Sequence, residues 1–201
     1  KEHLYWSYAN LGMAHAALSA GADAYDRMHF IIRNKLYAGL MDGTMKLGSL
    51  KEDERLKLVL PQACCYCGDS SVLTLDHLIP LSRGGADTAD NVVWACRSCN
   101  SSKGGLDLLE WHEKTGRFPS ILLLRRYMKI AIDFCSNRAL MDVRVDDAPP
   151  LPFSLKSVPL AFPELVHLKL WVTPLREDCL PPDHPARPCS TTRGRRRRLS
   201  G

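Results

Sequence analysis

Two closely spaced pairs of cysteines constrain this chain more than any other feature of its sequence. Cys64 and Cys67 form one Cys-x-x-Cys pair, and Cys96 and Cys99 form a second pair after 28 intervening residues. Each pair can turn two thiolates toward one centre, and two such pairs supply the four tetrahedral ligands of a structural zinc ion. Binding of Zn2+ can contribute on the order of 10–16 kcal/mol to the folding of a small unit. Because four thiolates leave no open coordination position, we expect this ion to hold structure, with Cys65 as a spare thiol.

The cysteines could also serve without a metal, either as buried core residues or as disulfides of the kind found in small secreted proteins. The stretch from Ala14 to Ala22 is rich in small residues, but His15 interrupts it and it lacks the apolar run of about 7–15 residues that a secretory leader has. No stretch approaches the ~20 apolar residues of a membrane-spanning helix. We therefore expect a cytoplasmic protein without a membrane anchor, either a fragment or a chain whose true start is Met13 or Met28.

The positive charge of the chain is concentrated at one end. The formal net charge is +5, and Arg193 with Arg195–Arg198 supplies five positive charges in a stretch without acids, so residues 1–189 sum to zero. A neutral body excludes a broadly basic nucleic-acid-binding protein, and any attraction to phosphate must come from a few placed residues. The arginine run itself is either an electrostatic clamp for nucleic acid or a cloning or reading-frame remnant.

The sequence patterns predict an α+β chain, in which helices flank a small zinc-bound ββα unit. We expect helices at 22–41, 50–58, 106–114 and 119–134, and strands at 71–75 and 92–95. The expected organisation is a poorly ordered extension at 1–21, a helical segment at 22–60, the zinc unit at 61–104, helices at 105–140 and a low-complexity tail at 141–201. Ten of the thirteen prolines lie between Pro149 and Pro188, so this Pro-rich, Arg-rich tail is predicted to be disordered.

The helix expected at 119–134 is predicted to pack through one apolar face. The residues assigned to that face are Leu122, Leu123, Tyr127, Ile130 and Phe134, and the basic residues expected to point elsewhere are Arg125, Arg126 and Lys129.

The residues between and after the cysteine pairs carry a second pattern. It contains Asp76 and His77 at the end of a strand-like run, then a Gly84–Gly85 loop, then Asn91, and Asn100 directly after the last cysteine. In order and spacing, the segments 65–68, 73–85 and 91–104 resemble the HNH endonuclease family in its zinc-stabilised form. The resemblance covers about 40 of the 201 residues and is specific, because several independent elements agree.

The resemblance implies a metal-dependent nuclease that hydrolyses phosphodiester bonds in DNA, with double-stranded DNA as the expected partner. His77 would be the general base that polarises the attacking water. Asp76 and Asn100 would hold one divalent cation, Mg2+ or another such as Mn2+ or Ni2+, against the scissile phosphate. Asn91 would brace the loop and orient His77. The residues implied to contact nucleic acid are Lys103 and Arg83. The family has His at its last motif position, so Asn100 leaves the preferred metal open.

Elementary chemistry agrees with these assignments. An imidazole titrates close to working pH, and carboxylate and amide oxygens suit a hard cation better than zinc. Adjacent residues on a regular strand point to opposite faces, so Asp76 and His77 can share a site only if the strand ends or bends there. Pro80 and the glycines that follow make such an ending plausible.

Each of these residues could also serve a purely structural role. Asp76 could cap a turn, His77 could be a satisfied structural histidine, and Asn91 could be an ordinary loop residue. Lys103 could be a solvated helix residue. The rival functional hypothesis is a zinc module that binds nucleic acid or protein without cutting. Trp94 and Trp111 could stack on bases, although we expect both to pack beside the zinc unit.

Overall fold

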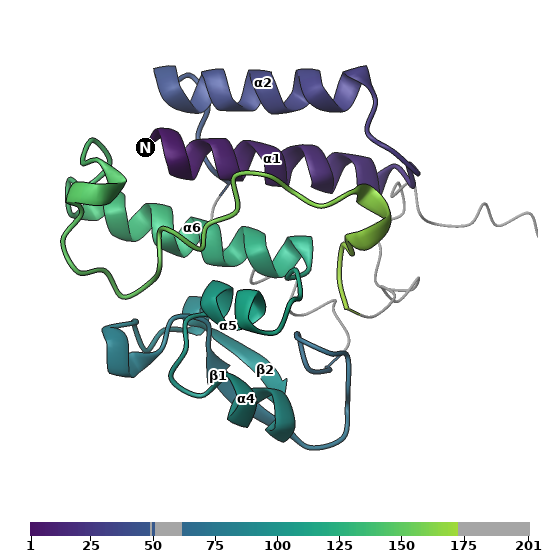
Figure 1. Ribbon diagram of the computed structural model, residues 1–201, viewed down its shortest axis with the longest axis vertical. Coiled ribbons are helices and arrows are strands. Elements are labelled where there is room, and N and C mark those ends of the chain that lie inside the picture. The colour runs from purple at the N-terminus through teal and green to yellow at the C-terminus, as the bar shows by residue number, and fades with distance from the viewer. Residues whose placement is uncertain (49, 51–61, 173–201) are drawn as a thin grey trace, which may run out of the picture.

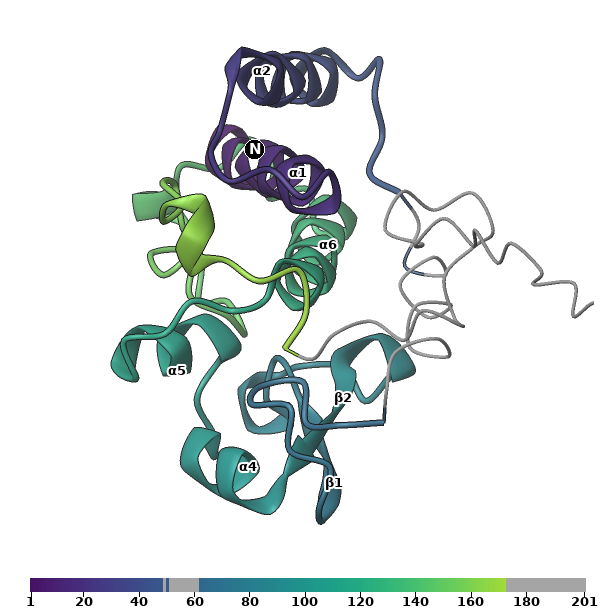
Figure 2. The ribbon, with the colours of Figure 1, turned by 90° about the vertical axis from the view of Figure 1, so that its right-hand side faces the viewer.

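The computed structural model describes residues 1–48, 50 and 62–172. The long helices stack with α1 (Glu2–Ser19) between α2 (Arg27–Asp42) and α6 (Ile121–Asn137), as Figures 1 and 2 show. A smaller part contains β1 (Leu73–His77), β2 (Val92–Cys96) and α4 (Arg97–Lys103), and α5 (Leu108–Lys114) lies between this part and α6 (Figure 1). The predicted mixture of helices with a small sheet is confirmed. None of the described helices has the length and apolar character needed to span a bilayer.

The expectation of a poorly ordered N-terminal extension is wrong, because α1 is part of the core. Leu4, Leu11 and Ala14 are buried, although the helix lacks a clear apolar stripe. Helices on both sides bury it on more than one face, so its sequence has no single apolar side. The small residues allow this packing: a side chain at Gly12 would meet the Leu36 side chain of α2 at 2.6 Å.

The two strands form an antiparallel hairpin whose ends position the motif residues. Asp76 lies opposite Val93, and His77 lies opposite Val92. The first strand therefore ends at His77, two residues beyond the sequence-based boundary, because its pairing with β2 continues that far. The loop between the strands contains two single-turn helices, η1 (Leu81–Arg83) and η2 (Ala89–Asn91). Within this loop Gly85 is required, since a Cβ there would lie 2.1 Å from the carbonyl oxygen of Ile79.

The packing of α6 differs from the predicted face in two basic residues. Arg126 and Lys129 are buried rather than directed at solvent, and only Arg125 of the three is partly exposed. The apolar prediction fares better, since Leu122, Leu123 and Tyr127 are buried. A basic side chain can be buried when backbone oxygens receive its N–H groups, which the pattern of a helix does not reveal.

The segment from 141 to 172 is also more ordered than the proline content suggested. Phe153, Val158, Leu165 and Leu168 are buried in the common core, and short helices occur at η3 (Val145–Asp147) and η4 (Leu165–His167). Proline excludes regular helix and central strand, but it permits an extended chain that packs. The remaining tail, with the arginine run, and nearly all of the helix expected at 50–58 lie outside the described residues.

Candidate functional site

The four paired cysteines meet in one cluster. The Sγ atoms of Cys64, Cys67, Cys96 and Cys99 all lie within 4.8 Å of one another. Zn–S bonds of about 2.3 Å in a tetrahedron place sulfur atoms about 3.8 Å apart. The Sγ atoms of Cys67 and Cys96 are 3.7 Å apart, so the donor set fits such an ion. The backbone N–H of Cys99 donates to the Sγ of Cys96 at 3.5 Å and lowers the pKa of that thiol, which favours the thiolate that a metal requires.

Cys65 stands apart from this cluster, as expected for a spare thiol. Its side chain is buried, and burial together with nearby Cys64 raises its pKa well above the ordinary value. Its backbone N–H donates to the carbonyl oxygen of Trp94 at 2.9 Å, which ties the first cysteine pair to β2.

The next residue, Tyr66, packs edge-on against Trp111 of α5, with ring centroids 4.9 Å apart.

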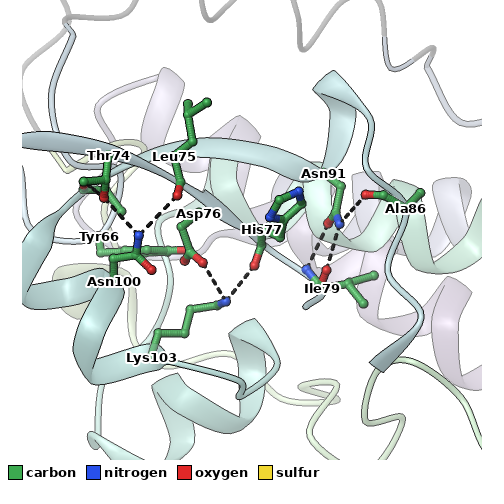
Figure 3. Close-up of polar contacts among 11 residues, drawn as sticks. Tyr66, Thr74, Leu75, Asp76, His77, Ile79, Ala86, Asn91, Asn100 and Lys103 are labelled. Carbon is green, nitrogen blue, oxygen red and sulfur yellow. Dashed lines mark hydrogen bonds and ion pairs between the residues drawn. The ribbon is translucent and has the colours of Figure 1, made fainter. Parts of the chain in front are cut away.

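Asp76 lies in a buried polar cluster rather than at an open surface. Its side chain is 7% exposed, and its Oδ2 accepts a 2.6 Å hydrogen bond from the hydroxyl of Tyr66. Its Oδ1 is 3.2 Å from the Nζ of Lys103, whose side chain is fully buried. The same ammonium donates to the carbonyl oxygen of His77 at 2.6 Å (Figure 3). Lys103 therefore neutralises Asp76 in this structure, and the expectation that it contacts nucleic acid does not match its position.

His77 faces a different environment from its neighbour Asp76. Its Nε2 lies 2.9 Å from the Oδ1 of Asp87, and its side chain remains 24% exposed. Figure 3 shows its ring directed away from the cluster of Asp76 and Lys103. Asp76 and His77 are both paired in register with β2, so the strand does not end or bend between them, and alternation directs the two side chains to opposite faces. Asp87 was missed by the sequence analysis, because a second acid, Asp90, follows in the same loop and nothing in the pattern distinguishes them.

Asn91 fastens the loop that follows His77. It is almost fully buried, and its Nδ2 donates to the carbonyl oxygens of Ile79 at 2.8 Å and Ala86 at 2.9 Å. Its Oδ1 accepts from the N–H of Ile79 at 2.9 Å (Figure 3). These hydrogen bonds of the Asn91 side chain go to Ile79 and Ala86, so any effect of Asn91 on His77 is indirect and acts through the loop.

Arg126 of α6 also supports this loop, a role that the sequence analysis did not predict. Its guanidinium donates to the carbonyl oxygens of Ala89 and Asp90, which belong to η2 together with Asn91. The signal that could have indicated this role is its place on the apolar side of α6, among residues that pack.

Asn100 and Arg83 lie at the edges of the site. The Nδ2 of Asn100 donates to Thr74 Oγ1 at 2.9 Å and to the carbonyl oxygen of Leu75 at 3.2 Å. Its amide oxygen accepts no hydrogen bond within the described part of the chain. Arg83 forms an ion pair with Glu110 at 2.6 Å, and both side chains are partly exposed.

The two tryptophans have different surroundings. Trp111 is buried and donates from its Nε1 to Ser102 Oγ at 3.1 Å, as the packing expectation required. The same expectation is wrong for Trp94, which is 40% exposed on β2 opposite the exposed Leu75. The outer face of a two-stranded hairpin has no covering layer among the described residues, so alternation leaves both side chains in solvent.

The oxygen atoms of Asp76 and Asn100 fit a hard divalent cation if that cation can share the Asp76 carboxylate with Lys103. Asp76 and Asn100 supply a carboxylate and a free amide oxygen, which are the ligand types that Mg2+ or Mn2+ takes. Each carboxylate oxygen already accepts one bond but retains a second lone pair. A cation bound there would share Asp76 with the ammonium of Lys103.

Comparisons with known proteins identify this part of the chain. Residues 64–105 match the family of HNH endonucleases. The CRISPR-associated endonuclease Cas9 of Corynebacterium diphtheriae is 34% identical over 56 residues, which are 26% of this chain and 5% of that protein. The chain thus spans a small fraction of that relative's length. No solved structure matches. The matched residues, the HNH unit, contain the cysteine cluster, the hairpin and the helix after it.

Proposed function

We propose that this protein is a metal-dependent nuclease that hydrolyses phosphodiester bonds in DNA, with His77 as the general base. The observation that carries the proposal is the pairing of the His77 Nε2 with Asp87 at 2.9 Å, inside the HNH unit. His77 is the one histidine between the two cysteine pairs. Its side chain is partly exposed at the end of β1, where a substrate can reach it.

The pairing with Asp87 suits a base. If Nε2 carries the proton that Asp87 accepts, the lone pair of Nδ1 is available to take a proton from water. Asp87 then stabilises the imidazolium that forms, as a carboxylate beside a protonated histidine does. Asn91 holds the loop through Ile79 and Ala86, and this brace limits the movement of the residues next to His77.

Asp76 and Asn100 are the residues that would hold the divalent cation. When bound, such a cation offsets negative charge on the phosphate and on the leaving oxygen. Lys103 holds the buried carboxylate of Asp76 in place through the 3.2 Å contact. We also propose that the ion in the cysteine cluster is structural zinc, since four sulfur ligands leave no open position.

Double-stranded DNA is the proposed substrate. Because residues 1–189 carry no net charge, binding has to rely on local groups such as Arg83, which lies near the loop of His77. Arg83 is paired with Glu110, and phosphate would have to compete with that carboxylate for the guanidinium.

A plasmid cleavage time course tests the proposal directly. The zinc-loaded wild type, the His77→Ala variant and a His15→Ala control on α1 are incubated with supercoiled plasmid and Mg2+, Mn2+ or Ni2+, with EDTA as a blank. We expect wild type and control to convert the plasmid to nicked or linear DNA, and His77→Ala to lose at least about a hundredfold in rate, the contribution typical of a general base. Equal rates for wild type and His77→Ala would refute the assignment.

The burial of Asp76 with Lys103 specifically favours a second candidate, a zinc module that binds nucleic acid without cutting. In that case the ammonium already supplies the counter-charge that Asp76 needs, and a divalent cation has no role. DNA binding that persists in EDTA, with no cleavage under any of the three metals, would support this module over the nuclease.

A further inference from the structure

A cavity of about 640 Å³ lies beside the first cysteine pair. Its walls come from the loop of residues 65–67, the turn at 116–118 after α5, and the last described segment, residues 163–172. Figure 1 shows that the chain after η4 runs past the start of α6, and the N–H of Ile121 donates to the carbonyl oxygen of Lys169 at 2.9 Å. The cavity therefore opens beside the N-terminus of α6.

Two buried polar side chains on the floor of this cavity have no hydrogen-bond partner. His112 is 4% exposed and Ser120 is 5% exposed. Within the described ranges, neither ring nitrogen of His112 nor the hydroxyl of Ser120 is bonded. Ser120 holds the N-cap position of α6, yet its side chain makes no capping bond. Buried polar groups are nearly always satisfied, so these two groups call for a partner other than the described side chains, an ordered water or a ligand.

The rim of the cavity is basic. Arg117, His167 and Lys169 line it with exposed side chains, and the described lining residues include no carboxylate. Within that part of the chain, Arg117 and Lys169 form no ion pair with an acid. The N-terminus of α6 adds a partial positive charge, although its first two amides already donate to Lys169 and Leu170. All these groups favour an anion.

We propose that this cavity binds the phosphate group of a nucleotide, with Ser120 and His112 as donors at the floor and Arg117 and Lys169 as cations at the rim. Burial and the nearby Arg117 lower the pKa of His112 to about 4, so at neutral pH its ring is neutral and offers one N–H. The volume lies within the range of cavities that hold molecules of nucleotide size. Phe118 and Tyr66 supply aromatic wall on which a base or sugar can pack.

The nucleotide has two possible sources, a DNA strand or free nucleotide. A strand phosphate fits the proposed nuclease, and in that form the inference rests on the proposed function. Tyr66 connects the cavity with the candidate active site, because it lines the cavity and its hydroxyl donates to Asp76. The neighbouring cavity of about 440 Å³ shares His112 and Arg117, but Glu113 also lines it and would repel a phosphate.

The test measures binding, independent of cleavage. The zinc-loaded full chain with His77→Ala is titrated with deoxyadenosine 5′-monophosphate by calorimetry and with a labelled DNA duplex by fluorescence anisotropy. The rim variant carries Arg117→Glu and Lys169→Glu. The matched control carries Lys114→Glu and Arg144→Glu, which make the same change in charge at exposed positions that do not line the cavity. Zinc content and circular dichroism confirm that all proteins are folded, and Ser120→Ala provides a second variant without a change in charge.

We expect the rim variant to bind the ligand at least about tenfold more weakly than the control, since the loss of one charge-assisted hydrogen bond is already worth a factor of that order. Weaker duplex binding supports a strand phosphate. In that case the slope of the logarithm of the binding constant against the logarithm of salt concentration should become shallower by about one for each lost phosphate contact. Weaker binding of the nucleotide alone supports a free nucleotide. Equal affinities of rim variant and control for both ligands overturn the proposal, and this outcome leaves the cleavage test of His77 unaffected.

Discussion

At the scale of single residues, the ion pair of Asp76 and Lys103 gives a direct prediction for stability. Both side chains are buried, so removing one partner leaves an uncompensated charge. We expect Lys103→Met to lower the free energy of unfolding by about 3–5 kcal/mol, measured by thermal denaturation with zinc present. Adding Asp76→Asn to this variant removes the stranded charge and should recover much of the loss, because the amide oxygen still accepts from Tyr66.

The exposed Lys114 provides the control for this prediction. Lys114→Met makes the same chemical change on the surface and should alter stability by no more than about 0.5 kcal/mol. If Lys103→Met unfolds no earlier than Lys114→Met, then Lys103 does not neutralise Asp76 and is free to serve DNA binding, as the sequence first suggested.

These residues also show what a sequence can and cannot predict at this scale. The spacing of the cysteines was sufficient to predict their cluster, because a Cys-x-x-Cys pair converges locally and only two pairs had to meet. The partners of the motif residues were not predictable. Tyr66, Asp87 and Arg126 approach the motif residues through the fold, and whether Lys103 turns to solvent or to Asp76 depends on packing that the local pattern does not contain.

At the scale of one element, α5 carries two buried titratable groups with opposite effects. Asp107 caps the helix by accepting from the N–H of Leu109 at 2.9 Å, and Tyr127 donates to it at 2.8 Å. Burial raises its pKa to about 6. Between pH 4 and 6 the unfolded chain ionises Asp107 while the folded chain keeps its proton, so Asp107 makes stability fall as pH rises. His112, with its pKa lowered to about 4, makes stability rise over the same window.

We expect the two slopes to offset each other in the wild type and to separate in the single variants. Relative to wild type, Asp107→Asn should gain stability from pH 4 to pH 6 by up to about 1.4 kcal/mol per pH unit. His112→Leu should lose relative stability over the same range. Urea unfolding in phosphate-free buffer measures both, and Asp133→Asn on the surface of α6 corrects for the loss of one charge. Parallel pH profiles for all four proteins would contradict the opposed titration.

The elements themselves were predicted to different degrees. Strands and helices with a clear period were found within a few residues, as the pairing of β1 shows. Helix α1 was missed because two neighbours bury it, which removes the one-sided pattern that identifies a helix at a surface. The segment from 141 to 172 was misjudged because packing of an irregular chain leaves no periodic signal. Its burial depends on single residues such as Phe153 and Leu168.

At the scale of the whole molecule, specific bonds fasten the HNH unit to the stacked helices. The N–H of Leu108 donates to the carbonyl oxygen of Leu78 at 3.1 Å, which joins α5 to the loop after β1. Tyr127 of α6 donates to Asp107, and the guanidinium of Arg126 holds η2. The stacked helices have their own contacts, since α1 packs on both α2 and α6. The HNH unit has two five-residue strands and one seven-residue helix, too little apolar surface to fold without its metal.

Because the HNH unit depends on its metal and the stacked helices do not, we expect removal of the metal to unfold only part of the structure. Chelation of zinc from the full chain should abolish hydrogen-exchange protection in β1 and β2, while amides of α1 and α6 stay protected, as measured by mass spectrometry of peptides. Cys67→Ser should behave like the chelated protein, because it removes one ligand. Cys65→Ala should retain zinc and protection, since Cys65 lies outside the cluster. If α1 and α6 lost protection together with the strands, the bonds through Leu108, Arg126 and Tyr127 would make the two parts one cooperative unit that the metal stabilises as a whole.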